Sequence, residues 1–301
     1  MDMNRLTPEA IAAYALYLRS EERAPGTIEK YLRDVRSFAA WLEERTVTKD
    51  LAAAWKEHLV STNHAPATVN SMLAAINSLF RFQGRDFRIK FLKVQRRMFR
   101  DSTRELTRPE YDLLVDTARA SGKERLALLM EAICGTGIRV SEVKYLTVEA
   151  AQRGRAEITL KGKIRVILLP NKLCRKLLKY ARKEKIASGD LFVTRSGKSL
   201  SRRQIWAEMK RLCKAAGVAP EKVFPHNLRH LFATTYYRAY KDIAKLADVL
   251  GHSSIETTRI YLLTTGDEQV KQLDRLGLVS YANSTINQIN IWSLLMGRIW
   301  R

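Results

Sequence analysis

The strongest constraint on the fold is a set of apolar side chains that recur every three or four residues over positions 25–43. In PGTIEKYLRDVRSFAAWLE they are Ile28, Tyr31, Leu32, Val35, Phe38, Ala39 and Leu42. This spacing places them on one face of an α-helix, and such a face is stable only when other helices cover it. Residues 66–82 repeat the pattern, and residues 7–18 and 50–60 add two shorter apolar segments. The sequence therefore predicts a bundle of about four helices over residues 1–92.

The chain changes character after this bundle. Residues 93–105 are polar and basic without a helical period, and they predict an interdomain linker. Thr107 and Glu110 then have the spacing of a capping box, and Pro109 suits a first helical turn. We expect a second domain to begin there and to span residues 106–280.

A β-hairpin is predicted inside the second domain. Residues 157–170 contain two β-rich runs on either side of a turn that carries Lys161 and Lys163. Residues 190–194, with the sequence DLFVT, predict a third strand.

Helices follow these strands. Ser201 and Gln204 have the spacing of a second capping box, for a helix that closes near Gly217, and helical patterns continue from about residue 227 past residue 275. The predicted fold is mainly α with a small antiparallel β-sheet.

Charge is distributed unevenly between these regions. The chain has 53 Lys and Arg against 31 Asp and Glu, a formal charge of +22 that attracts polyanions. Residues 1–92 carry 13 basic and 11 acidic side chains, whereas residues 161–214 carry 17 and 3. We expect the second segment to be the nucleic-acid face, with six cations as candidate DNA contacts: Lys172, Arg175, Lys176, Lys179, Arg202 and Arg203. A solubilising surface or an RNA-bound ribosomal protein would also explain the charge alone.

Several protein classes are not supported by the sequence. It has no apolar run long enough for a transmembrane helix and no signal peptide, so we expect a cytoplasmic protein without a membrane partner. Cys134, Cys174 and Cys213 form no C-x-x-C pair, which indicates neither a disulfide framework nor a thiolate zinc site.

Three short motifs carry candidate chemistry, but each alone has an ordinary explanation. Arg139 and Glu142 in GTGIRVSEV (135–143) could form a helical salt bridge. The two histidines of HNLRHLFATT (226–235) have the spacing of zinc ligands but lack the glutamate of H-E-x-x-H. His252 and Tyr261 in LGHSSIETTRIYL (250–262) could be a loop residue and a half-buried aromatic.

Taken together and in this order, the motifs and the lysine hairpin resemble the tyrosine site-specific recombinases of the lambda-integrase and Xer type. The match runs over about residues 5–279, since residues 27–42 also look like the helical, SAM-like core-binding domain of that family. The resemblance implies a core-binding domain that clamps DNA and a tyrosine-recombinase catalytic domain. It further implies site-specific cleavage and rejoining of DNA through a 3′-phosphotyrosyl intermediate, without a cofactor.

The resemblance also assigns roles to individual residues. Tyr261 is the implied nucleophile, and a phenol with an ordinary pKa near 10 needs cations nearby to lose its proton. Arginine forks suit phosphate oxygens. The remaining implied members are the clamp Arg139 and Arg229, the proton-moving or donating His226 and His252, and the supporting Glu142 and His230.

A hairpin lysine is the implied general acid for the leaving 5′ oxygen. We assign this role to Lys161, which keeps the Lys-Gly step of the family's usual G-K-G-x-K-x-R turn. The turn here reads L-K-G-K-I-R, one residue shorter between the first lysine and the arginine. Lys163 therefore stays as the second candidate.

Partners and alternatives follow from the same resemblance. The expected partners are double-stranded recombination sites, other copies of the chain in a tetrameric synapse, and an accessory directionality factor; the expected location is the nucleoid in the cytoplasm. Integration or excision of a mobile element and Xer-like resolution are both consistent with the motifs. The alternatives are a type IB topoisomerase, a non-catalytic DNA-binding protein and a metal-dependent nuclease. Residues 281–301 do not look like family sequence; they are an unusual tail or an added extension, and we favour the extension.

Overall fold

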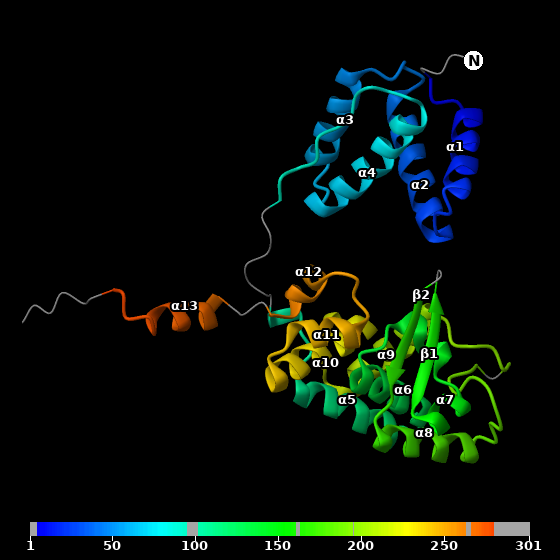
Figure 1. Cartoon of the computed structure of the whole chain (residues 1–301), viewed down its shortest axis with the longest axis vertical. Helices are drawn as coiled ribbons and strands as arrows, with labels where there is room; N and C mark the ends of the chain where they lie inside the picture. The colour runs from blue at the N-terminus through cyan, green and yellow to red at the C-terminus, as the bar shows by residue number, and fades with distance from the viewer. Residues whose placement is uncertain (1–4, 95–101, 161–162, 195, 263–265, 280–301) are drawn as a thin grey trace, which may run out of the picture. The chain divides into compact units, whose positions relative to one another are not determined.

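The computed structural model describes residues 5–94, 102–160, 163–194, 196–262 and 266–279 of the 301-residue chain. The chain divides into two compact units, Met1–Arg96 and Arg97–Arg301 (Figure 1). The first unit is the expected helical bundle, which consists of α1 (Pro8–Ser20), α2 (Pro25–Leu42), α3 (Lys49–Ser61) and α4 (Pro66–Phe82).

Aromatic side chains fill the centre of the first unit. Tyr14, Phe38, Trp55 and Phe80 are all buried, and the rings of Phe38 and Trp55 lie 5.5 Å apart. These residues lie on the apolar faces that the three- and four-residue spacing predicted, because burial of that face drives the bundle together.

The segment after α4 runs back along the bundle. Two asparagines of α4 fix its backbone: Asn77 exchanges hydrogen bonds of 2.9 and 2.8 Å with Ile89, and Asn70 does the same with Leu92. A carboxamide has one donor and one acceptor side, so it pairs with a peptide group as another strand would. This pairing holds residues 88–93 against α4.

Among the described residues of the second unit, the regular elements are helices and one β-hairpin. Its elements are η1 (Ser102–Arg104), α5 (Arg108–Ala120), α6 (Glu124–Thr136), η2 (Val140–Tyr145), α7 (Val148–Arg153), β1 (Arg155–Leu160), β2 (Lys163–Leu168), α8 (Asn171–Lys183), α9 (Arg202–Ala216), η3 (Pro220–Lys222), α10 (Pro225–Tyr240), α11 (Ile243–Leu250), α12 (Ile255–Thr258), η4 (Arg259–Leu262) and α13 (Gly266–Asp274). The prediction of a mainly α fold with a small antiparallel sheet is confirmed.

Local sequence signals located the helix starts correctly. Thr107 and Glu110 form the predicted capping box of α5, and Ser201 and Gln204 form that of α9. The helix α9 ends at Gly217, which adopts a left-handed conformation.

The predicted third strand is wrong. Within the described residues the sheet contains only β1 and β2, paired from Arg155↔Leu168 to Leu160↔Lys163. Residues 190–194 make isolated bridges to two different segments, at Thr147 and Ser199. The adjacent side chains Leu191 and Phe192 are both buried, so the segment lacks the alternation of a strand.

The second compact unit includes residues that precede position 106, where we expected the catalytic domain to begin. The Arg104 carbonyl accepts a 2.7 Å hydrogen bond from Asn227, which ties η1 to α10. The proposed boundaries at 92, 105 and 280 remain predictions, and residues 281–301 lie outside the described part of the chain. None of the described helices is long and apolar enough to cross a membrane.

Candidate active site

Arg139 lies in the sharp turn that follows α6. The helix ends at Gly137, whose φ of 65° is a left-handed conformation, and a Cβ there would lie 2.5 Å from the Phe232 ring. Beyond the turn, Glu142 accepts hydrogen bonds of 2.9 Å from both the backbone N–H and the guanidinium of Arg139. Glu142 is buried while the Arg139 side chain is 40% exposed, so the guanidinium can still meet a ligand.

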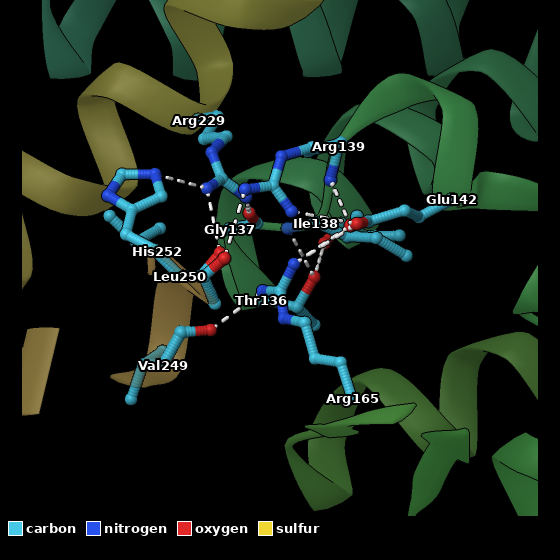
Figure 2. Close-up of polar contacts among 12 residues, drawn as sticks. Thr136, Gly137, Ile138, Arg139, Glu142, Arg165, Arg229, Val249, Leu250 and His252 are labelled. Carbon is cyan, nitrogen blue, oxygen red and sulfur yellow. Dashed lines mark hydrogen bonds and ion pairs between the residues drawn. The ribbon is translucent and has the colours of Figure 1, made fainter. Parts of the chain in front are cut away.

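Arg229 approaches the same place from α10 and is only 3% exposed. Its guanidinium donates to the carbonyls of Gly137 and Leu250 and lies 2.9 Å from His252 Nε2 (Figure 2). Burial, and then the charge of Arg139, lower the pKa of Arg229 to about 10, so it stays protonated at neutral pH.

The C-terminal end of α11 organises these arginines. Three consecutive carbonyls each accept a hydrogen bond from a different guanidinium: Val249 from Arg165 at 2.7 Å, Leu250 from Arg229 at 2.9 Å and Gly251 from Arg139 at 3.2 Å. The last carbonyls of a helix have no partner within the helix and carry the negative end of its dipole, so they attract cations. This helix end sets the spacing of the positive charges.

His252 follows directly and is held in one tautomer. Arg229 can only donate, so His252 Nε2 must be the acceptor in that 2.9 Å contact. The proton is then on Nδ1, which lies 2.9 Å from Thr258 Oγ1 and donates to it. Burial, and then the charge of Arg229, lower the pKa of His252 to about 4, so the ring is neutral at neutral pH.

This neutral histidine should make stability depend on pH. The pKa of His252 falls from 6.5 to about 4 on folding, so the unfolded chain binds the extra proton more readily between these values. Stability should therefore decrease as pH falls from 6.5 towards 4. We expect the urea midpoint of His252→Gln to fall less over this range than that of the wild type. His64→Gln, at an exposed histidine of the first unit, is the control and should keep the wild-type slope; equal slopes for both variants would contradict the assignment.

Tyr261 lies in η4 and is 5% exposed. Its ring stacks at 6.2 Å on His252 and meets His230 edge-on at 5.1 Å. Leu246 and Leu250 pack in the same cluster. A pocket of about 600 Å³ opens beside it, lined among others by Arg139, His226, Arg229, His252 and Arg202.

The structure thus brings together most of the predicted site residues. Tyr261, Arg139, Arg229, His226 and His252 line one pocket; Glu142 and His230 brace it from behind. Lys161 lies outside the described residues. Lys163 is placed by its backbone alone, opposite Leu160 at the end of the hairpin.

The six predicted DNA-facing cations lie in two places, at the start of α9 and along α8. Arg202 lines the pocket, and Arg203 is exposed beside it at the start of α9. Lys172, Arg175 and Lys179 are exposed on α8, and Lys176 pairs with Glu131 at 2.6 Å. In Figure 1, α8 lies at the opposite end of the second unit from α12, so the structure does not bring these four to the pocket.

Sequence reasoning missed two residues of this constellation. Thr258, fully buried, fixes His252, and Arg165 shares Glu142 with Arg139. A charged residue at an odd position of β2, the side that also carries the buried Ile167, was the available signal for Arg165. That side of the strand carries Lys163, Arg165 and Ile167, so Arg165 looked like one more basic residue of the lysine turn. Among the described residues, no three His, Cys, Asp or Glu side chains come together as a metal-binding group.

Comparison with known proteins decides the family. The model of the phage integrase family matches residues 104–266, more than half of the chain. The chain belongs to the phage integrase family. The N-terminal SAM-like domain of phage integrases matches residues 11–86.

Its relatives are tyrosine recombinases. Tyrosine recombinase XerA of Thermococcus kodakarensis is 31% identical over 282 residues, which cover 90% of this chain and 96% of XerA. XerC of Roseiflexus castenholzii is 30% identical over 282 residues, covering 84% and 88%. The predicted resemblance is confirmed, and the protein is a tyrosine recombinase, an enzyme that cleaves and rejoins DNA strands. The topoisomerase and non-catalytic alternatives are not favoured.

Solved structures share the fold. A lambda integrase (75–356) dimer bound to a COC′ core site aligns with a TM-score of 0.69 at 19% identity, over 85% of this chain and 95% of the other. XerH bound to a palindromic difH substrate aligns with a TM-score of 0.68 at 20% identity, over 83% and 79%.

Proposed function

We propose that this recombinase breaks DNA by attack of the Tyr261 hydroxyl oxygen on a phosphodiester phosphorus. The P–O bond to the 5′ oxygen breaks, the tyrosine becomes linked to the 3′ phosphate, and the 5′ oxygen takes a proton and leaves as a hydroxyl. Reversal with a 5′ hydroxyl from a partner strand rejoins the DNA without a nucleotide cofactor, because the phosphotyrosyl link conserves the energy of the bond.

The observation that carries this proposal is the convergence of Tyr261 and two arginines on one pocket. Arg139 and Arg229 are positioned before the substrate arrives, so they can stabilise charge on the nonbridging oxygens without reorganisation. Neutral His252, whose unprotonated Nε2 faces Arg229, is poised to accept the phenol proton; once protonated, Nε2 can donate to a phosphate oxygen. We assign the leaving-group proton to Lys161, with Lys163 as the alternative.

The first unit supplies a second basic surface for the DNA duplex. A groove of about 530 Å³ lies where α2 and α4 meet the segment held by Asn77, and it is lined by five cations: Arg23, Arg81, Arg88, Lys90 and Lys93. The near-neutral composition of the first 92 residues hides this local cluster. We propose that this groove and the pocket side of the second unit, with Arg202 and Arg203, grip the duplex through its phosphates.

We also propose the larger context of the reaction. Exposed Val270, Leu273 and Leu276 around α13 support docking on a neighbouring copy within a tetrameric synapse. Relatives named XerA and XerC favour a Xer-type enzyme over a mobile-element integrase. Such a protein works on chromosomal or element DNA in the cytoplasm, at the nucleoid.

A nicked suicide substrate tests this proposal. Duplex sites are first selected by the protein from a random library, then nicked so that the fragment beyond the cleavage point diffuses away. In excess chelator the wild type should accumulate a covalent protein–DNA adduct, because the proposed chemistry needs cationic side chains and no metal. On intact sites, sequenced junctions should join strands from two different duplexes.

Three outcomes would contradict it. An adduct or cleavage that disappears with chelator would favour the metal-dependent nuclease. Relaxation without exchanged strands would favour the topoisomerase, and tight binding without any adduct would favour a non-catalytic protein.

A further inference from the structure

Arg165 is a charged and largely buried residue of the lysine hairpin. It lies on β2, two residues after Lys163, and its side chain is 13% exposed. The same side of the strand carries the buried Ile167, while Val166 and Leu168 are exposed. Because burying an unpaired charge is costly, the guanidinium must be held by specific partners.

Its partners belong to the active site. Arg165 Nη1 lies 3.2 and 3.0 Å from the two oxygens of Glu142, the carboxylate that also holds Arg139. Arg165 Nη2 donates to Val249 at 2.7 Å (Figure 2). One buried carboxylate is thus shared by two arginines, one turned to the pocket and one not.

This sharing determines the charge that a phosphate meets. Arg139, Arg165 and Arg229 with Glu142 sum to +2, which matches the two negative charges that nonbridging oxygens carry in a pentacovalent transition state. Without Arg165, Glu142 would offset most of the charge of Arg139. Its second oxygen would also draw Arg139 inwards, away from the pocket.

Arg165 also packs closely against the backbone of Gly251. The φ of Gly251 is 61°, and a Cβ built on it would lie 2.4 Å from Arg165 Cδ and 2.5 Å from Nε. The aliphatic part of Arg165 therefore occupies the space of that side chain. A larger residue at position 251 would therefore collide with Arg165, which lies directly against the turn whose carbonyls hold the other arginines.

We propose that Arg165 is a positioning residue of the recombination site. It contacts neither the tyrosine nor the phosphate; it fixes Glu142 and the C-terminal turn of α11, and thereby the orientation of Arg139 and the placement of His252. The inference rests on the proposed function, because the quantity it controls is the rate of DNA cleavage.

The test measures binding and cleavage separately on the nicked substrate. Arg165→Met keeps an unbranched apolar stem but removes the end of the guanidinium and its charge. We expect site affinity within about threefold of wild type, because Arg165 does not line the pocket. Single-turnover cleavage should be slower by on the order of a hundredfold, as expected for displaced catalytic groups. Arg165→Lys keeps the charge but cannot reach Glu142 and Val249 together. Its cleavage rate should therefore lie between those of the wild type and Arg165→Met. Arg155→Met, on the exposed side of the same hairpin, is the matched control and should cleave normally.

Two further readouts separate positioning from general support of the fold. A methylphosphonate at the scissile position removes one of the charges that the arginines neutralise, so it should narrow the rate difference between wild type and Arg165→Met. Gly251→Ala displaces the same guanidinium. The double variant Gly251→Ala with Arg165→Met should therefore cleave only slightly more slowly than the slower single variant, whereas at independent sites the two reductions in cleavage rate would multiply.

The results that overturn the proposal are distinct from failure of the proposed function. If the wild type forms an adduct and folded Arg165→Met cleaves normally, the inference is wrong and the function stands. It is also wrong if the site affinity and the cleavage rate of Arg165→Met fall by the same factor. It is equally wrong if the loss of cleavage rate is unchanged on the methylphosphonate substrate and the losses of Arg165→Met and Gly251→Ala multiply in the double variant. If Arg165→Met does not fold, Arg165→Lys decides by the same criteria. A wild type without adduct contradicts the function instead.

Discussion

Tyr261→Phe is expected to form no covalent adduct with DNA while binding it as tightly as the wild type. The substitution removes only the hydroxyl oxygen. The ring keeps its stacking on His252 and its edge contact with His230, and it stays in the cluster with Leu246 and Leu250. Catalysis should therefore be lost completely and packing preserved, which a denaturing gel after reaction with the nicked substrate and a binding titration will measure.

The matched control is another tyrosine near the site. Tyr236 follows the H-x-L-R-H motif on α10 and contacts Phe232 and Tyr240. Tyr236→Phe should form the adduct at the wild-type rate. An adduct on Tyr261→Phe would place the nucleophile elsewhere, and peptide mapping of that adduct would identify it.

The elements of the fold that could be predicted from sequence are those set by local physics. Helix periodicity and the capping boxes at Thr107 and Ser201 involve groups three or four residues apart, and the structure has them as expected. The third strand failed because strand formation depends on a partner. The backbone of residues 190–194 found two partners at Thr147 and Ser199, and no strand was formed.

The candidate site could be predicted only as a set of residues, through the resemblance to a family. Arg139, Arg229 and Tyr261 are separated by tens of residues, and no local rule brings them together. The organising feature is also invisible in sequence: it consists of the carbonyls of residues 249–251, which every residue type possesses. Arg165 ends the lysine turn compared with the family pattern, but its role was missed for this reason, since its partners are a backbone carbonyl and a carboxylate already assigned to Arg139.

Arg229→Ala and Arg139→Ala should slow cleavage similarly but differ in stability. Each removes one preorganised positive charge from the transition state, a loss on the order of a hundredfold to a thousandfold in rate. Arg229, however, is 3% exposed and satisfies the carbonyls of Gly137 and Leu250. Leaving a buried acceptor without a partner costs about 1–3 kcal/mol, so Arg229→Ala should also lower the free energy of unfolding substantially.

Arg139→Ala should be much less destabilising, because its side chain is 40% exposed and Glu142 keeps its ion pair with Arg165. We expect its free energy of unfolding to stay within about 1 kcal/mol of wild type, because the half-exposed Arg139 is lost while buried Glu142 keeps one cation. Urea unfolding and single-turnover cleavage on the nicked substrate measure both quantities for the two variants. Equal destabilisation by the two substitutions would mean that Arg165 does not neutralise Glu142 alone. A normal cleavage rate for either would remove that arginine from the phosphate clamp, since a preorganised charge that contacts the transition state cannot be deleted without a loss of rate.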